Sequence, residues 1–184
     1  MIIGICGKSG SGKSTLARQI IKHNNNAIHL DIDKIGHQVL LIPEVKKELV
    51  KSFGDCIIQE NNISRKKLGE IVFASRMEMK KLSDITWDYM QKEIDKFLID
   101  NKDKIIVLDW LLLPLSKYFN MCNIKILLDV PYEIREQRAM KRDNISKEKF
   151  VSREKASINF NTKDFDYILD KNEEEFVKRL VKLL

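Results

Sequence analysis

One short pattern near the start of the chain constrains its fold more than any other feature. Residues 7–14 read Gly-Lys-Ser-Gly-Ser-Gly-Lys-Ser and fit the pattern G-x-x-x-x-G-K-[ST]. The pattern follows the short apolar run of residues 1–6 and precedes residues with helical spacing, so we expect a strand, a tight loop and a helix in that order. Glycines let the backbone N–H groups of such a loop curl around phosphate oxygens. The pattern therefore predicts a P-loop that holds a nucleoside triphosphate.

Each position of this loop has an expected role. The lysine of the pattern, Lys13, neutralises the charge of the β- and γ-phosphates and is predicted to be catalytic, while the hydroxyl of Ser14 is expected to bind Mg²⁺. The alternative, a glycine-rich turn with an unrelated lysine, is disfavoured because a strand-like and a helix-like segment flank the loop. The full phosphate-binding set is predicted to be Gly7, Lys8, Ser9, Gly10, Ser11, Gly12, Lys13, Ser14 and Thr15.

Length and composition set the class of protein. The 184 residues, of which 43% are hydrophobic and 33% charged, suit a single domain over residues 1–184 with one core. No apolar stretch reaches the roughly 20 residues of a membrane span, and no basic flank marks a signal peptide, so we expect a cytoplasmic protein without a membrane partner. The net charge of +6 is dispersed, which argues against nucleic-acid binding. The three cysteines are widely spaced, so we expect reduced thiols and no zinc site.

Strand-like and helix-like segments alternate along the chain. Short apolar runs, which are typical of buried parallel strands, predict an α/β fold with a five-stranded parallel sheet flanked by helices. An insertion over residues 35–103 is expected to be helical and to hold the acceptor substrate. The predicted strands are residues 1–6, 27–30, 105–108, 124–130 and 167–169, and the predicted helices of the insertion are residues 43–53, 65–73 and 75–101.

Three carboxylates come at the predicted ends of strands. Asp31 and Asp33 follow the second strand, and alternation along an extended chain would put them on one side, facing the phosphate loop. Either is a candidate to orient or deprotonate an acceptor hydroxyl, or to anchor Mg²⁺, and the alternative is that one of them caps a helix beginning near Lys34. Asp109 ends the third strand, where a carboxylate would help to hold the water shell of a metal. The alternative for Asp109 is an ordinary aspartate at the start of a loop.

An arginine-rich helix is expected after residues 129–131. Arg138 and Arg142 are four positions apart and therefore project from one helical face, as expected of arginines on a lid that stabilise a transferring phosphoryl group. We expect the lid to span residues 138–163, with residues 147–155 as a part of it. Arg135, by contrast, is expected on a solvated face, paired with Glu133 and Glu136.

Together these motifs resemble the dephospho-coenzyme A kinase family over nearly the whole chain. The resemblance includes the loop of residues 7–15, the Asp31 and Asp33 pair, and the box of residues 65–73, which reads Arg-Lys-Lys-Leu-Gly-Glu-Ile-Val-Phe. It continues with Asp-Val-Pro at residues 129–131 followed by Arg138, Arg142 and Asp143, and it ends at residues 168–172, which look like the closing strand and adenine-side loop of the family.

The resemblance implies a reaction. ATP would be the donor, with Mg²⁺, and the 3′-hydroxyl of dephospho-coenzyme A would be the acceptor. Asp33 would act on that hydroxyl, and Arg65 and Lys66 would contact the phosphates of this small-molecule substrate. Asp31 and Asp109 complete the expected acceptor-binding set, and the protein would be a monomer or a weak oligomer.

The chain departs from the family pattern on the acceptor side. Thr86-Trp87-Asp88 replaces a His-Pro pair, and residues 109–115 keep the aspartate of a D-x-P-L-L-F-E box but lose its glutamate. Trp110 is expected in the core, with stacking on a base or on the pantetheine arm as the alternative. Two other functions remain open: a related P-loop kinase acting on another nucleoside or nucleotide, and a non-catalytic ATP-binding regulator.

Overall fold

The structure of the protein is a computed structural model that describes residues 1–171 and 174–184. These residues form two compact units. The first unit comprises Met1–Asp31 and Asn101–Leu184, and the second comprises Ile32–Asp100. The expected single domain, with its insertion at residues 35–103 and lid at residues 138–163, stays a prediction.

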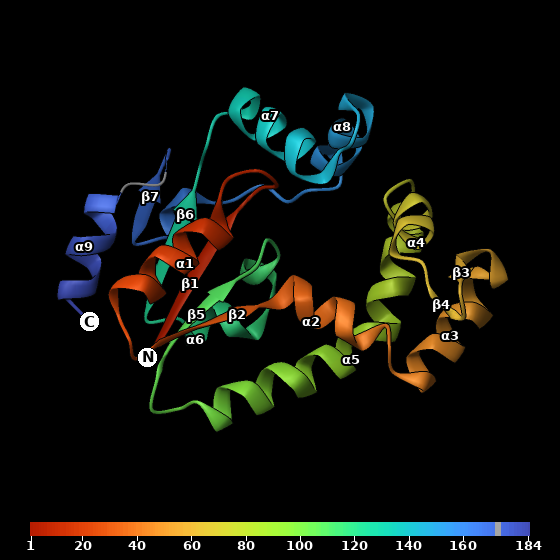
Figure 1. Cartoon of the computed structure of the whole chain (residues 1–184), viewed down its shortest axis with the longest axis horizontal. Coiled ribbons are helices and arrows are strands. Elements are labelled where there is room, and N and C mark those ends of the chain that lie inside the picture. Colours follow the sequence, from red (N-terminus) through yellow and green to blue (C-terminus); the bar gives the residue numbers. More distant parts are fainter. Residues whose placement is uncertain (172–173) are drawn as a thin grey trace. The chain divides into compact units, whose positions relative to one another are not determined.

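A five-stranded parallel sheet forms the centre of the first unit (Figure 1). Its strands are short and mostly apolar, and β1 and β5 are buried almost throughout, as expected for central strands with both faces covered by helices. The strand order is β2-β5-β1-β6-β7. The strands are β1 (Ile2–Gly7), β2 (Ala27–Asp31), β5 (Ile105–Asp109), β6 (Ile124–Leu128) and β7 (Tyr167–Leu169).

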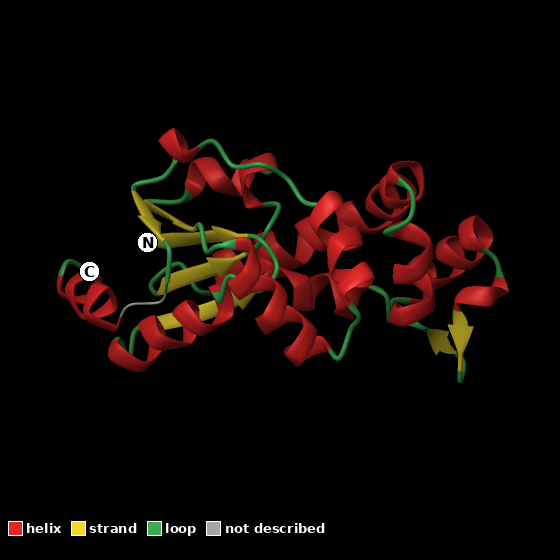
Figure 2. Cartoon of the chain, turned by 90° about the horizontal axis from the view of Figure 1, so that it is seen from above, coloured by secondary structure: helices red, strands yellow, loops and turns green. Residues whose placement is uncertain are grey.

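Helices pack on both faces of this sheet (Figure 2). On one face, α1 (Lys13–His23) and α9 (Glu174–Lys182) bury apolar side chains such as Leu16 and Val177 against β1, β5 and β6. On the other face, Gly4 of β1 lies against Leu113 and against Cys122, which follows α6 (Lys117–Met121). This arrangement confirms the predicted fold class. The ends of β1, β2 and β5 each differ from the predicted ends by at most one residue. β6, by contrast, ends at Leu128, two residues earlier than predicted.

Two helices after β6 pack on each other. The ring of Tyr132 in α7 (Tyr132–Asp143) meets the ring of Phe150 in α8 (Lys147–Lys155) edge to face, with centroids 5.4 Å apart. Lys147 Nζ lies 3.5 Å from a carboxylate oxygen of Glu136, which ties the first turn of α8 to α7. The two helices therefore form one packed pair.

The second unit is mostly helical. Its helices are α2 (Ile32–Val39), α3 (Pro43–Phe53), α4 (Arg65–Val72) and the long α5 (Arg76–Asp100), against which the other three pack. α3 confirms the helix predicted over residues 43–53. α4 ends one residue earlier than predicted, and α5 is one residue shorter than predicted at each end. A hairpin of β3 (Ile58–Gln59) and β4 (Asn62–Ile63) was not predicted. None of the described helices is long and apolar enough to cross a bilayer.

Candidate active site

The phosphate loop joins the carboxyl end of β1 to the first turn of α1. Gly10 and Gly12 have φ angles of 81° and 94°, a region that side chains other than glycine rarely adopt. A Cβ atom on Gly10 would lie 2.2 Å from the carbonyl oxygen of Arg135, so the loop approaches α7 more closely than any side chain at this position would allow. Both glycines are therefore needed for the shape of the loop.

The loop presents polar groups suited to an anion. The amide of Ser11 donates to the carbonyl of Lys8 at 3.1 Å, which closes a tight turn. The hydroxyl of Ser11 is buried and, among the residues that the structure describes, finds no hydrogen-bond partner. A buried hydroxyl without a partner is costly, so it favours a bound acceptor oxygen. The amino-terminal N–H groups of α1, where Lys13 and Ser14 lie, add to the attraction for phosphate.

Ser14 and Asp109 form the best-defined pair of the site. The hydroxyl of Ser14 donates to Oδ2 of Asp109 at 2.6 Å, and His29 Nε2 lies 3.5 Å from the same oxygen. Asp109 is only 3% exposed. Burial opposes its ionisation, but the close approach of His29, the charge of Lys13 and the Ser14 hydrogen bond together hold its pKa below the ordinary value. Asp109 is thus a carboxylate at neutral pH.

This pair also fits a magnesium ion. A hydroxyl and a carboxylate supply the hard oxygen donors that Mg²⁺ prefers, and the ion usually needs few protein ligands because phosphates and water complete its shell. In residues 1–171 and 174–184, no three His, Cys, Asp or Glu side chains come together in a metal cluster. The Ser14 hydroxyl and the Asp109 carboxylate are the kind of donors that bind Mg²⁺ together with the phosphates of a nucleotide.

Asp31 and Asp33 do not share one strand face, which corrects the alternation argument. β2 ends at Asp31, where it is in register with Asp109 on β5, so these two carboxylates belong to neighbouring strand ends. α2 begins at Ile32, two residues earlier than the expected helix start, because Ile32 and Ile35 bury one helical face. Asp33 consequently lies in the first turn of α2, in the second unit, with an exposed side chain.

Arg138 and Arg142 both lie on α7 and are exposed. Arg142 pairs with Asp143, with Nε 2.7 Å and Nη2 2.9 Å from its carboxylate oxygens, and Arg153 of α8 binds the same carboxylate. These hydrogen bonds hold the pKa of Asp143 below its ordinary value. Arg138 is exposed one helical turn before Arg142 on the same helix.

The expectation for Arg135 is wrong. Its side chain is 7% exposed, and its guanidinium pairs with Glu154 of α8 rather than with Glu133 or Glu136. Helical spacing identifies partners on the same helix only, and Glu154 lies 19 residues farther along the chain. Burial opposes ionisation of Glu154, but hydrogen bonds from Arg135 and Lys8 hold its pKa below the ordinary value. This cluster was the main feature of the site that sequence reasoning missed.

The predicted acceptor-binding cations lie at the start of α4 in the second unit. Nη1 of Arg65 donates to Nδ1 of His37 on α2 at 3.0 Å. Lys66 is exposed beside it in sequence. Ser64 caps this helix by accepting from the amide of Lys67, which fixes where the helix and its cations begin.

Two further positions were singled out from the sequence. Trp110 is 7% exposed, which confirms it as a core residue. The expected adenine-side loop at residues 168–172 falls partly outside the described residues, because Asn172 is not among them.

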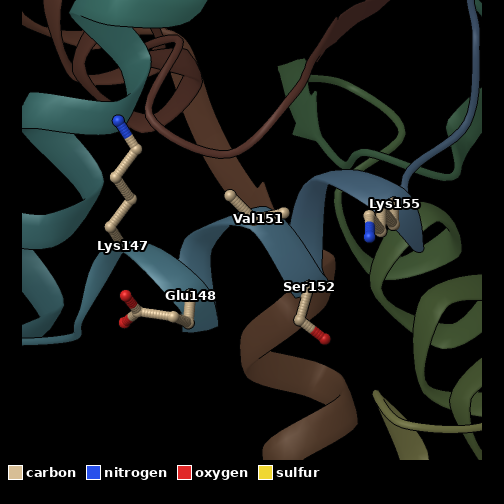
Figure 3. Close-up of a pocket in the computed structure, with 5 residues that line it drawn as sticks. All are labelled: Lys147, Glu148, Val151, Ser152 and Lys155. Carbon is tan, nitrogen blue, oxygen red and sulfur yellow. The ribbon is translucent and has the colours of Figure 1, made fainter.

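A hollow of about 480 Å³ runs along α8 (Figure 3). It is lined by Val151 and Ser152 in the middle, with the charged side chains of Lys147, Glu148 and Lys155 around them. The hollow lies on the helix expected to belong to the lid, and the phosphate loop contributes none of its lining among the described residues.

Comparisons with known proteins agree on one family. A family model described as dephospho-CoA kinase matches residues 1–175. The dephospho-CoA kinase of Aquifex aeolicus is 35% identical over 98% of this chain and 94% of that protein, and that of Lactobacillus johnsonii is 33% identical over 82% and 78%. These matches extend through both units, so they include the P-loop, Asp33 and the box at residues 65–73.

Solved structures agree on the fold. The structure of a Thermus thermophilus protein matches 100% of this chain and 95% of that chain, with a TM-score of 0.80 and 24% identity. The structure of dephospho-CoA kinase from Campylobacter jejuni matches 99% of this chain and 94% of that chain, with a TM-score of 0.57 and 22% identity. With the P-loop geometry and the family model covering nearly its whole length, the chain belongs to the dephospho-CoA kinase family.

Proposed function

We propose that this protein transfers the γ-phosphoryl group of ATP to the 3′-hydroxyl of dephospho-coenzyme A, producing coenzyme A and ADP. The observation that carries the proposal is the family match over residues 1–175, which includes both the donor and the acceptor side. The P-loop with its Ser14–Asp109 pair supports the donor half of this reaction independently of the match.

On the donor side, the loop and Lys13 bind the phosphates of ATP. Lys13 neutralises charge on the β- and γ-phosphates, and the N–H groups at the start of α1 bind their oxygens. Ser14, oriented by Asp109, would hold Mg²⁺. Bound there, the ion would neutralise charge on the phosphates.

On the acceptor side, Asp33 orients the 3′-hydroxyl and accepts its proton. The hydroxyl oxygen forms a bond to the γ-phosphorus while the bond from that phosphorus to the bridging oxygen breaks, and ADP leaves with the electron pair. Arg138 and Arg142 stabilise the charge on the transferring group, since a planar guanidinium fork matches phosphoryl oxygens. Arg65 and Lys66 bind the phosphates of the acceptor.

Asp33→Asn tests the acceptor side. We expect kcat to fall at least ~10²-fold with the dissociation constant of ATP nearly unchanged, because the amide fills the same space but cannot take the proton. ADP release with ATP and dephospho-coenzyme A gives kcat, and calorimetry without acceptor gives ATP binding. Asp100→Asn, which changes an exposed aspartate at the end of α5, is the matched control and should keep wild-type rates. A near-normal kcat in Asp33→Asn would contradict the role of Asp33.

The same assay separates the alternatives. If the wild-type protein binds ATP but forms no coenzyme A, a panel of nucleoside and nucleotide acceptors distinguishes a kinase of another substrate from a non-catalytic regulator. ADP release with one member of that panel would indicate the former.

A further inference from the structure

Glu154 connects three segments of the first unit that are distant in sequence. Its Oε1 accepts from Lys8 Nζ of the phosphate loop at 2.8 Å and from Arg135 Nη2 of α7 at 3.1 Å. Its Oε2 accepts from Arg135 Nη1 at 2.7 Å. Glu154 itself belongs to α8, so one carboxylate binds the loop and both packed helices. We call Lys8, Arg135 and Glu154 the loop clasp.

Arg135 extends the loop clasp to the backbone of the phosphate loop. Its Nε donates to the carbonyl of Val130 at 2.9 Å, and its Nη1 lies 3.5 Å from the carbonyl of Ser9. The backbone of Arg135 also packs directly against Gly10. The guanidinium thus contacts Glu154, the segment that precedes α7 and the loop at once, which a lysine ammonium could not do.

The ion pairs of Glu154 with Arg135 and Lys8 are shielded from solvent and are therefore stronger than ion pairs on an exposed surface. The Arg135–Glu154 pair is a two-bond, charge-assisted contact between side chains that are 7% and 18% exposed, so solvent screens it less than a surface pair. Lys8 is 24% exposed and completes the cluster. The cluster carries two cations and one carboxylate and keeps a net positive charge beside the loop.

A glycine-rich loop needs such support. Glycine loses more conformational freedom on ordering than any other residue, and residues 7–12 include three glycines. If the loop were free in the absence of nucleotide, ATP would have to order it on binding, and affinity would fall by that cost. A loop that is already held binds phosphate without this loss.

We propose that Glu154 is a positioning residue, which through Lys8 and Arg135 holds the phosphate loop in its binding shape and ties that shape to the position of α8. The proposal rests on the proposed function in that it takes the ligand of the loop to be ATP. The clasp acts on nucleotide binding, whereas the phosphoryl-transfer geometry is set by ATP once it is bound. Loss of the clasp should therefore change affinity far more than the chemical step.

Glu154→Gln is the direct test, because it keeps the size of the side chain and removes its charge. We expect the dissociation constant of ATP, measured by calorimetry without acceptor, to rise about tenfold, the range for losing hydrogen bonds between charged groups. The KM for ATP should rise in parallel, and kcat should stay within about twofold. An unchanged ATP affinity in the folded variant, even with a lowered melting temperature, would overturn the proposal and leave Glu154 a stabilising residue only.

Two further variants keep the test decisive. Glu148→Gln removes an exposed carboxylate from the same helix and should bind ATP like the wild type. Glu154→Asp keeps the charge but is one methylene too short to reach both cations, so we expect an intermediate rise in the dissociation constant. If Glu154→Gln does not fold, Glu154→Asp decides, and wild-type affinity in that variant would contradict the clasp.

A double-mutant cycle with Lys8→Ala separates direct from indirect effects. If Lys8 acts through Glu154, the double variant Lys8→Ala/Glu154→Gln should bind ATP about as weakly as the weaker single variant. Fully additive losses would show that Lys8 contacts nucleotide independently and would overturn the coupled arrangement. Because ATP binding is measured without acceptor, the outcome is readable even if dephospho-coenzyme A turns out not to be the substrate.

Discussion

At the scale of single residues, the hydrogen bond between Ser14 and Asp109 defines the donor side of the site. The bond is short, and Asp109 is buried and ionised because its neighbours offset the cost of burial. An ionised carboxylate in this place orients the serine hydroxyl and adds negative charge where a magnesium ion would bind. We therefore propose that Asp109 acts on the metal side of the reaction more directly than on the acceptor.

Asp109→Asn tests this role. The amide keeps the shape of the side chain but removes the charge that would attract the metal, so we expect kcat/KM to fall about 10²-fold at low Mg²⁺ and to recover partly as Mg²⁺ is raised. A titration of activity against Mg²⁺ measures the shift. Asp103→Asn, an exposed change in the same unit, serves as the control. An unchanged Mg²⁺ requirement would contradict the proposed function of Asp109.

Residue-scale prediction from sequence succeeded where the chemistry is local. The P-loop is a contiguous pattern, and its glycines have the positive φ angles that the pattern implies. Arg135 was misplaced because its partner, Glu154, comes from another helix, and no spacing rule connects positions so far apart. Asp33 was placed on a strand face because the sequence contains no strong stop between β2 and α2.

At the scale of elements, β1 forms the centre of the sheet and is closely packed on both faces. Gly4 shows this most clearly, since a Cβ atom there would lie 2.7 Å from Cys122 Sγ and 2.8 Å from a methyl group of Leu113. Both neighbours are buried, and burial raises the pKa of the Cys122 thiol to about 12, so it is an inert packing group. The strand leaves no room for even a methyl group.

Gly4→Ala should therefore destabilise the protein by about 1–3 kcal/mol, the usual cost of overpacking a core. Urea denaturation measures the free energy of unfolding. The matched control is Gly36→Ala in α2, where the nearest atom to a new Cβ is 3.5 Å away and the change should stabilise by about 0.5–1 kcal/mol, because alanine favours helix. Equal effects at the two positions would contradict this description of the packing.

Elements were predicted well where apolar runs are unambiguous. The five sheet strands were found from short buried runs, and α3 was found with its bounds because Pro43 starts it and Gly54 follows it. The β3–β4 hairpin was missed because each strand has only two residues, too few for alternation to show. Its turn uses Glu60 and Asn61 at positive φ, and glutamate gives little signal for such a turn.

At the scale of the whole molecule, buried and paired carboxylates determine how stability responds to acid. Asp109, Asp143 and Glu154 all have pKa values held below their ordinary range. The unfolded chain therefore binds protons at a higher pH than the folded protein does. Their contribution is fully present above the unfolded values of about 4 and is lost as pH falls through the lower folded values.

We accordingly expect the free energy of unfolding to decrease below about pH 4 and to change little from these groups between pH 6 and 8. Urea denaturation at a series of pH values measures this dependence. Glu154→Gln should lose less stability between pH 5 and 3 than the wild type, while the exposed control Asp103→Asn should keep the acid dependence of the wild type. Identical acid dependence in wild type and Glu154→Gln would show that this carboxylate is not coupled to folding.

Direct identification of the product tests the central claim. After incubation of the purified protein with ATP, Mg²⁺ and dephospho-coenzyme A, mass spectrometry and phosphorus NMR should show one added phosphoryl group, located on the 3′-hydroxyl, with an equal amount of ADP. Phosphorylation at another hydroxyl, or ADP formed without any phosphorylated acceptor, would contradict the account.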